Sequence, residues 1–336
     1  MTRYTKHAGS GHNELSIGNA FRFVAVVLGL VLSMQLASAQ SRREFHRVFE
    51  VSLADSVILD VQLSRGSLEI AYGREGQVSI TASTNNESSK ALSEDPFTNH
   101  LIVSVNGNHL EIRDVPDVPA DPDYNFAYRI DVPHRTEVRS FVQRGSETIN
   151  GVAGPVEART EDGGIKISYV SQTVRARTEA GNIDVQVVGG PVEAKAKRGN
   201  ISCVRCLQGV DVETEDGDIS LAVIGPSRAN VRRGTGGIKV GGIRGSFIGS
   251  TAAGELYVRA VPHSDWQLSS VSGSVRIELP PAAKFEIEAS TSSGEFIVKR
   301  NDFDTPEKQS HHLVRKVNGG GMHIEIHTES GLISIG

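Results

Sequence analysis

Four successive segments of the chain read VEARTEDGGIKISYVSQT (156–173), VRARTEAGNIDVQVVGGP (174–191), VEAKAKRGNISCVRCLQG (192–209) and VDVETEDGDISLAVIGP (210–226). In each segment apolar and polar residues alternate up to a glycine, alternate again after it, and end in a short turn. Alternation with a period of two is typical of a half-buried β-strand. Each segment therefore contains two short strands separated by turns.

The same pattern extends far beyond these four segments. Its glycines are Gly145, Gly163, Gly181, Gly199, Gly217, Gly236, Gly254, Gly273 and Gly294. A unit of two short strands is too small to bury its own apolar face, so successive units must stack and share a core. The sequence predicts an all-β fold, a β-helix-like β-solenoid with coils of about 18 residues and two short strands per repeat.

Two features of composition agree with a narrow coil interior. Alanine recurs at inward positions of the pattern, at Ala158, Ala176, Ala194 and Ala196, and only 5% of the residues are aromatic. Weaker copies of the unit occur at residues 59–70 and 324–335, so we expect the solenoid to run nearly end to end.

Two polar stretches interrupt the repeat. They are residues 83–127, which surround a short hairpin-like pair at 101–105 and 109–113, and residues 300–321, which end in three glycines. Open ends of a solenoid expose unpaired strands, so the first stretch is expected to cap or edge the stack.

The N-terminus has the pattern of a secretory signal peptide. The apolar run FVAVVLGLVLSMQLA (23–37) follows basic residues and precedes the small residues Ala37-Ser38-Ala39. At 15 residues it is short of the roughly 20 that a membrane-spanning helix needs, so a retained anchor is the alternative and cleavage after Ala39 the favoured interpretation. We therefore expect a signal peptide at 1–39, a solenoid domain at 40–336, and an exported product that is periplasmic, surface-bound or extracellular.

Charge and composition exclude several classes of function. A net charge of −5 lacks the basic excess that neutralises nucleic-acid phosphates. No later apolar run is long enough to span a bilayer, so no membrane span is expected after signal cleavage. Catalytic motifs such as G-x-S-x-G, H-E-x-x-H and the P-loop are absent, and no cofactor is predicted.

Several passages resemble the bacterial "putative adhesin" family, a domain of unknown function built of β-strand repeats. They are FHRVFEV (45–51), RGSLEI (65–70), the recurring T-E-D/A-G-x-I units, and the closing passage in which SSGEFIVKRNDF, a polar insert, three glycines and HIEIHTESGLISI follow one another. The resemblance covers about residues 45–336. It implies a secreted or surface solenoid without an established activity, and it supplies no catalytic residues.

Cys203-Val-Arg-Cys206 is the only cysteine pair. The two cysteines occupy the slots of Val185 and Val188 one repeat earlier, which favours buried thiols that behave as small hydrophobes. A local disulfide and a redox or metal site remain the alternatives.

Two polar clusters contain residue types that can bind metals, and in each the pattern favours another interpretation. His323, Glu325 and His327 should lie on the outer face of one strand, where the outer pair is too widely separated to share one ion. Acidic residues precede several repeat glycines, but Lys197-Arg198 stand between them and favour ion pairs between coils. We therefore predict no metal site.

The third residue after each repeat glycine should project outward, so these residues should form one row along the stack. The row comprises Lys166, Asp184, Ser202, Ser220, Lys239, Tyr257 and Arg276. The favoured interpretation is a non-enzymatic solenoid that binds a cell-surface polysaccharide or protein through this row. The alternatives are a structural cell-envelope component that self-associates through its ends, and a solenoid carbohydrate-active enzyme.

Overall fold

The computed structural model describes residues 43–52, 56–84, 95–115, 126–300 and 311–336. They belong to one compact unit, Arg43–Gly336. The predicted signal peptide, residues 1–39, lies outside the described residues. Among the described helices, none has the length and apolar character to cross a membrane.

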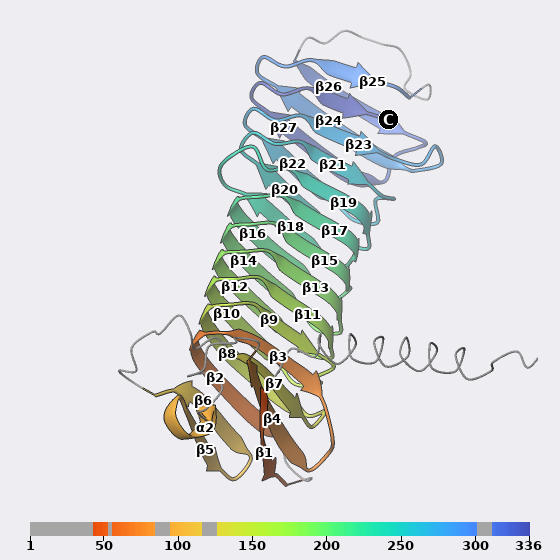
Figure 1. Ribbon diagram of the computed structural model, residues 1–336. Helices are drawn as coiled ribbons and strands as arrows, with labels where there is room; N and C mark the ends of the chain where they lie inside the picture. The colour runs from red at the N-terminus through yellow and green to blue at the C-terminus, as the bar shows by residue number, and fades with distance from the viewer. Residues whose placement is uncertain (1–42, 53–55, 85–94, 116–125, 301–310) are drawn as a thin grey trace, which may run out of the picture. The chain divides into compact units, whose positions relative to one another are not determined.

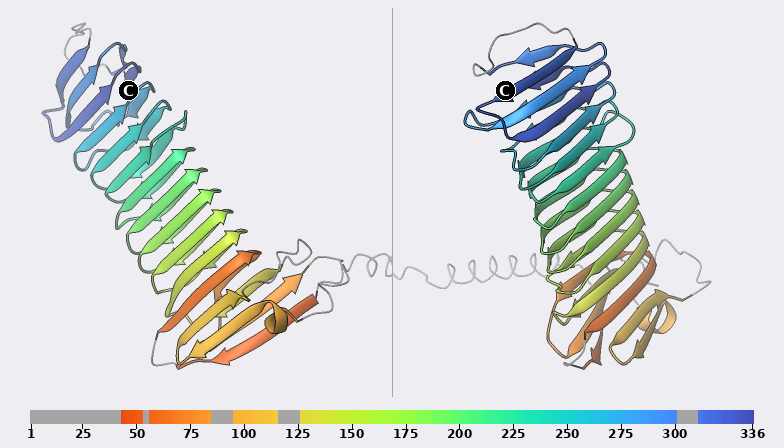
Figure 2. Two further views of the ribbon diagram at one scale, coloured as in Figure 1. Left: turned by 90° about the vertical axis from the view of Figure 1, so that its left-hand side faces the viewer. Right: turned by 180° about the vertical axis from the view of Figure 1, so that it is seen from behind.

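The unit consists of two sheets of 14 strands each, joined by turns along two edges (Figures 1 and 2). The predicted β-solenoid is thus confirmed, and its coils have two faces. We name the sheets A and B.

Sheet A contains, in spatial order, β1 (Arg43–Glu50), β4 (Gln77–Thr84), β7 (Ala127–Val132), β3 (Ser67–Tyr72), β9 (Glu147–Asn150), β11 (Ile165–Val170), β13 (Ile183–Val188), β15 (Ile201–Cys206), β17 (Ile219–Ile224), β19 (Ile238–Ile243), β21 (Leu256–Arg259), β23 (Val275–Glu278), β28 (Ile333–Ile335) and β25 (Phe296–Val298).

Sheet B contains, in spatial order, β26 (His312–Val317), β24 (Phe285–Thr291), β27 (Met322–Thr328), β22 (Trp266–Ser270), β20 (Phe247–Thr251), β18 (Ser227–Val231), β16 (Val210–Asp216), β14 (Val192–Arg198), β12 (Val174–Ala180), β10 (Val156–Asp162), β8 (Thr136–Arg144), β2 (Val57–Arg65), β6 (His109–Asp114) and β5 (Leu101–Asn106). One short helix, α2 (Pro96–Asn99), precedes β5.

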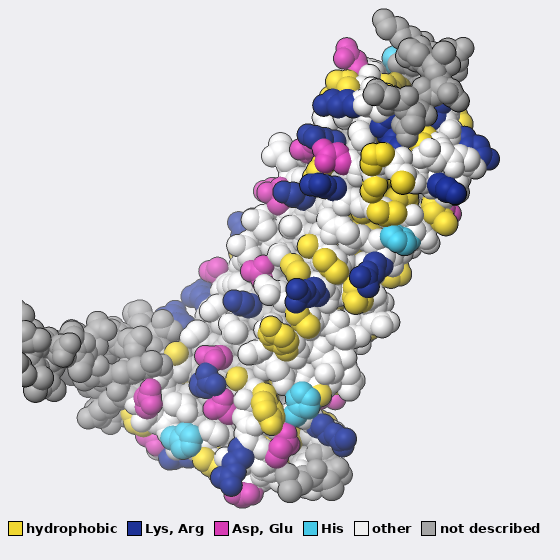
Figure 3. Space-filling model, turned by 90° about the vertical axis from the view of Figure 1, so that its right-hand side faces the viewer, with side chains coloured by type: hydrophobic (Ala, Val, Ile, Leu, Met, Phe, Trp, Pro, Cys, Tyr) yellow, Lys and Arg dark blue, Asp and Glu magenta, His cyan; other side chains and the backbone are white. Residues whose placement is uncertain are grey.

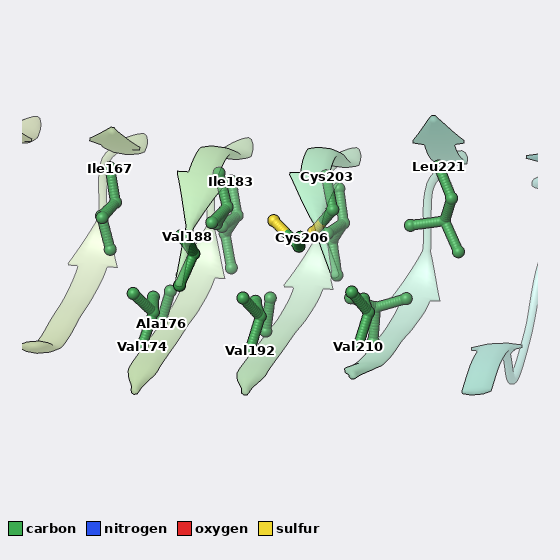
Figure 4. Packing of buried hydrophobic residues seen from close by; sticks show 14 of the residues in the cluster. Ile167, Val174, Ala176, Ile183, Val188, Val192, Cys203, Cys206, Val210 and Leu221 are labelled. Atoms are coloured by element: carbon green, nitrogen blue, oxygen red, sulfur yellow. The ribbon is translucent and has the colours of Figure 1, made fainter. Parts of the chain in front are cut away.

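Each regular coil contributes one strand to sheet B and the next strand to sheet A, and equivalent residues of successive coils are partners in parallel ladders. Val174, for example, pairs with Val156 and Val192. The inward residues form a continuous apolar core between the sheets (Figure 4). The predicted inward alanines are buried, Ala176 and Ala194 completely, so small side chains fill the interior as expected.

A column of glycines marks the corner where each coil passes from sheet B to sheet A. A Cβ atom on Gly199 would overlap the carbonyl oxygen of Gly181, and one on Gly217 would overlap that of Gly199. Gly199 also has a φ of 145°, a conformation that L side chains rarely adopt. The backbone of successive coils can therefore approach this closely only where the side chain is absent.

Buried hydroxyl groups satisfy the carbonyl oxygens of this corner. The Thr160 and Thr178 hydroxyls donate to the Gly163 oxygen at 2.8 and 3.0 Å, and the Thr214 hydroxyl donates to the Gly199 oxygen at 3.0 Å. A buried carbonyl without a partner is costly, so these threonines stabilise the corner.

The C-terminal coil departs from the order of the sequence. Strands β27 and β28 lie between the β22–β23 coil and the β24–β25 coil, so they pair with strands on both sides. Gly331 thereby stands between Gly273 and Gly294 in the column, although the sequence spacing suggests that the latter two are neighbours. The longer gap of 21 residues from Gly273 to Gly294 marks this break.

Both stretches expected to be polar insertions contain strands. The expected hairpin in 83–127 is present as β5 and β6, and β6 joins the edge of sheet B beside β2. In 300–321, residues His312–Val317 form β26, which closes the other edge of sheet B antiparallel to β24. Apolar Leu313 and Val317 face inward at this edge, which explains why a segment of polar composition forms a strand.

We expect replacement of Gly199 by alanine to destabilise the fold by about 3 kcal/mol or more, because the new methyl group overlaps backbone that cannot move within the stack. Gly241→Ala is the matched control, since a Cβ there meets no atom within 4 Å. Urea unfolding followed by circular dichroism measures both changes. Equal stability of the two variants would contradict the role of the column.

Candidate functional site

The predicted outward row exists as a continuous line on sheet A. Lys166, Asp184 and Ser202 are Cα partners on β11, β13 and β15, and Ser220, Lys239, Tyr257 and Arg276 continue the line on β17 to β23. The residues on either side of each row position are buried, so the row faces solvent. Neighbouring members are spaced by the distance between strands, about 4.8 Å.

A groove with a volume of about 600 Å³ lies over the last four members of this row. Ser220, Lys239, Tyr257 and Arg276 line it, whereas Lys166, Asp184 and Ser202 lie outside the groove on the same face. Asp218, Thr235 and Glu255 are the other polar side chains of the lining. The sequence pattern alone did not single out these three residues. Asp218 and Glu255 could have been found, because each directly follows a repeat glycine.

Three side chains form a connected group at one end of the groove. The Tyr257 hydroxyl donates to Glu278 Oε2 at 2.7 Å, and the Arg276 guanidinium lies 5.3 Å from the centre of the Tyr257 ring. Arg276 also pairs with Glu278. The aromatic ring is therefore held in place by a hydrogen bond at its tip and by a cation over its face.

These contacts set the charge state of the group. The hydrogen bond from Tyr257 and that from Arg276 lower the pKa of the Glu278 carboxyl. The same hydrogen bond to Glu278 raises the pKa of the Tyr257 phenol. At neutral pH the carboxylate stays ionised and the phenol keeps its proton, so this end of the groove offers fixed donors and acceptors.

A ladder of amide and carboxylate side chains fixes the other rim. Asn182 Oδ1 accepts from the backbone N–H of Asn200 at 2.9 Å, Asn200 Oδ1 from that of Asp218 at 2.8 Å, and Asp218 Oδ1 from that of Gly237 at 2.7 Å. Each side chain thus satisfies the backbone of the next coil. The ladder holds Asp218 in one orientation at the groove.

The arrangement is suited to binding polar molecules with many hydroxyl groups. The groove presents the cations Lys239 and Arg276, the carboxylates Asp218 and Glu255, and the Tyr257 ring. An aromatic surface surrounded by a few placed donors and acceptors is the usual composition of a small-molecule site.

The cysteine pair lies in the core and not at a surface site. Cys203 pairs with Val185 and Leu221 in the ladder, and both cysteines are free and buried (Figure 4). Burial raises the pKa of the Cys203 thiol well above its ordinary value and that of Cys206 to about 11. Thiols in this state are poor nucleophiles and poor metal ligands.

The two polar clusters considered as metal sites are solvent-exposed surfaces. His323, Glu325 and His327 lie on the outer face of β27, and the described residues contain no group of three or more histidine, cysteine or acidic residues that could hold a metal ion. On the glycine edge, Lys197 pairs with Glu179 of the preceding coil, an ion pair of the expected kind.

A second hollow, of about 520 Å³, lies on sheet B. Asn230, Ser250, Ser269 and His327 line its floor as successive ladder partners, and Arg232, Arg233 and Glu329 stand at its side. Sequence analysis did not predict it. Its lining contains no phenylalanine, tyrosine or tryptophan, and we assign the candidate site to the groove on sheet A.

One buried carboxyl group breaks the pattern of the core. Glu147 occupies an inward position of β9 between Leu68 and Ile165, and only 1% of its surface is exposed. Its Oε2 accepts a hydrogen bond from Ser140 at 2.6 Å, and its Oε1 has no hydrogen-bond partner among the described residues. Burial raises the pKa of this carboxyl to about 7, although the Ser140 hydrogen bond opposes the shift.

Comparisons with known proteins identify the family but not an activity. Residues 57–336 match the model of the family described as Toastrack DUF4097. A search of the curated proteins finds no match.

Three similar solved structures are bacterial. A "putative adhesin" from Bacteroides fragilis is 12% identical, with 88% of this chain and 98% of that chain covered and a TM-score of 0.37. A "putative cell adhesion protein" from Clostridium sporogenes is 10% identical, with 88% and 99% covered and a TM-score of 0.22. A "putative lipid binding protein" from Parabacteroides distasonis is 12% identical, with 88% and 97% covered and a TM-score of 0.34. At these TM-scores the likenesses carry no argument about function.

We expect Glu147 to make the fold less stable as the pH rises. The pKa of its carboxyl is raised in the folded state from 4.5 to about 7, so folding favours the protonated form. Its ionisation therefore removes about 3 kcal/mol of stability between about pH 4.5 and about pH 7, and nothing more is lost above that range.

Urea unfolding at about pH 5 and about pH 8 tests this effect. Relative to the parent, Glu147→Gln should gain stability at the higher pH and little at the lower. The substitution Glu161→Gln, at a partly exposed position, should show no such difference. A parallel pH dependence of the parent and Glu147→Gln would be incompatible with a raised pKa.

Proposed function

This chain belongs to the Toastrack DUF4097 family, and we propose that it is an exported, adhesin-like protein that binds a surface polysaccharide through the groove on sheet A. The observation that carries the proposal is the convergence of Ser220, Lys239, Tyr257 and Arg276 in one groove. These residues come from four successive coils, so the groove runs along the stack, across the strands of sheet A.

A polysaccharide fits this surface better than a small isolated ligand. Along the row the same backbone position recurs at every coil, at intervals of about 4.8 Å. A polymer with repeating polar units can contact several coils at once, and the members outside the groove, Lys166 to Ser202, extend the contact. Many weak contacts along one chain add up to useful affinity.

The charge state of the groove favours binding over catalysis. A glycoside hydrolase usually needs one carboxylic acid that keeps its proton at neutral pH. The pKa of Glu278 is lowered by Tyr257 and Arg276, so this carboxyl remains ionised. Among the described residues, the carboxyl whose pKa is raised to about 7 is that of Glu147, which is buried in the core.

Export of the protein follows from its N-terminal sequence in this proposal. The apolar run 23–37 and the small residues 37–39 support a cleaved signal peptide. An exported binding protein would meet polysaccharides in the periplasm, at the cell surface or outside the cell.

We expect Tyr257→Ala to weaken polysaccharide binding at least about tenfold, because an aromatic residue at the centre of a site is the usual energetic hot spot. The measurement is binding of the purified chain to an array of glycans and envelope polysaccharides, with and without a chelator. Arg276→Ala should act in the same direction, and the chelator should have no effect.

Tyr169→Asn provides the matched control, since Tyr169 is also an exposed tyrosine but lies outside the groove. It should leave polysaccharide binding unchanged. If the folded parent bound no polysaccharide, or if Tyr257→Ala bound as well as the parent, the proposal would fail.

A further inference from the structure

The edge of the stack opposite the glycine column has an unusual backbone. The residue six positions after four successive repeat glycines has a left-handed conformation, with φ of 56° at Tyr169, 55° at Val187, 59° at Arg205 and 54° at Val223. Glycine takes the same place in the next coil, where Gly242 has a φ of 78°. For a β-branched residue such as valine this conformation is a genuine outlier.

Three of the four left-handed residues are apolar; Tyr169 and Val223 are exposed, Val187 is partly exposed, and the fourth residue is Arg205. Tyr169 is 63% exposed and Val223 is 42% exposed, and Leu207, in the turn after β15, is 44% exposed. We call Tyr169, Val187, Leu207 and Val223 the apolar ridge. The ladders pair the residues that flank the left-handed ones in successive coils, so Tyr169, Val187 and Val223 lie in one line along the stack, with Arg205 between the two valines. Leu207 lies two residues beyond Arg205, beside this line. Figure 3 shows hydrophobic and basic side chains along this side of the molecule.

The charged residues of five successive coils at this edge are basic. The segments 169–173, 187–191, 205–209, 223–226 and 241–246 contain Arg205 and Arg244 but no acidic residue, and the next turn, 260–265, contains Asp265. The glycine edge of the same coils carries both signs, with the acidic residues Glu161, Asp162, Glu179, Glu215 and Asp216 and the basic residues Lys197, Arg198, Arg232 and Arg233. The two edges of one stack therefore differ sharply in chemistry.

Three carboxylates, Glu157, Glu193 and Asp211, follow the turns of this edge at one register position of sheet B. Glu193 is paired with Arg177 at 2.9 Å and with Lys195 at 3.0 Å, so its charge is compensated. Asp211 is exposed one coil further along. None of the three belongs to the turns that form the edge.

We propose that the apolar ridge docks this protein edge-on to the surface of an anionic lipid bilayer. A bilayer surface offers a flat, negatively charged boundary above an apolar layer, which matches a straight line of apolar side chains interspersed with arginine. The tyrosine fits the same place, since its ring is apolar and its hydroxyl can remain among the headgroups.

A second copy of the chain is a poorer occupant of the ridge. About a twofold axis perpendicular to the stack and through the centre of the ridge, each Arg205 would lie against an apolar residue of the other copy. About a twofold axis parallel to the stack, two ridges placed face to face would bring the two copies of Arg205 together. In that arrangement the two arginines would repel each other, and the five segments of this edge contain no carboxylate that compensates them.

The strain supports a role for the exposed side chains. Asparagine and glycine adopt this conformation readily, and Gly242 shows that the coil closes with glycine at this place. The chain nevertheless holds tyrosine and valine there, pointing away from the core. Strained residues that contribute nothing to the core are typical of functional positions.

Docking by this edge would leave the groove on sheet A accessible, because the ridge lies on the turns and the groove on a sheet face. The proposal does not depend on polysaccharide binding, and the variants below separate the two.

The test places an environment-sensitive fluorophore on an introduced cysteine in the full chain. Gln208→Cys puts it beside the ridge, and Ser272→Cys puts it in a turn at the glycine edge. Cys203 and Cys206 are buried, so the introduced thiol is the reactive one. The apolar run 23–37 can itself attach the full chain to vesicles. A fluorophore at one position still shows whether the ridge, and not only this run, contacts the bilayer.

With vesicles of equal parts phosphatidylcholine and phosphatidylglycerol, we expect the label at position 208 to brighten and to be quenched by a lipid-borne quencher. The label at position 272 should show neither change. With phosphatidylcholine alone, the response at position 208 should fall several-fold. An equal response at both positions, or none at position 208, would overturn the proposal.

The variant Tyr169→Asn/Val187→Asn/Val223→Asn, in the Gln208→Cys background, removes the three left-handed members of the ridge and keeps Leu207. Asparagine accepts the left-handed backbone, so the melting temperature should be unchanged or higher while the response at position 208 falls at least tenfold. Val271→Asn is the matched control, because Val271 is 51% exposed at the glycine edge. Tyr257→Ala should also leave the response unchanged. A full response from the triple variant would overturn the proposal, as would loss of the response in Val271→Asn.

Discussion

Contact between the backbones of successive glycines is the constraint on which the rest of this structure depends. Each glycine of the corner lies against the carbonyl oxygen of the glycine in the neighbouring coil, closer than any side chain would allow. This contact fixes how far one coil is displaced from the next. Once the displacement is fixed, every residue is placed beside its equivalent in the neighbouring coil. The core ladders, the hydroxyls that satisfy the corner and the outward row on sheet A all follow from that register.

The chain turns by a different backbone geometry at each of the two edges of the stack. At the glycine corner the backbone packs tightly, and polar, mostly charged residues surround it. At the other edge the chain turns through one left-handed residue per coil, and in four coils that residue is not glycine. A side chain there cannot reach the core, so its identity is free of packing requirements. That freedom is what allows one edge to acquire an apolar and basic surface without disturbing the fold.

The sequence predicted those features that repeat in every coil. Period-two alternation separated inward from outward residues, so the fold, the buried alanines and the outward row, Lys166 to Arg276, could be placed. The insertion of β27 and β28 between earlier coils could not be foreseen, because it depends on which of two chemically similar strands covers an open sheet edge. Thr235 was missed at the groove since it precedes its strand in an irregular turn. The left-handed backbone at Val187 and Val223 could not be predicted, because valine is typical of an extended strand.

The quasi-one-dimensional construction also determines how substitutions should be interpreted. In a solenoid each coil contacts only its neighbours, so the effect of a changed side chain stays within about one coil. Tyr257 contacts Glu278 and Arg276, whereas Tyr169 lies near the end of β11 several coils away, and no hydrogen bond or ring contact among the described residues joins the two to a common partner. The effects of changing the groove and the ridge should therefore be separable, and neither surface needs the other to move. A rigid stack can thus present a face for one kind of molecule and an edge for another, with the hydrogen-bonded ladders between them unchanged.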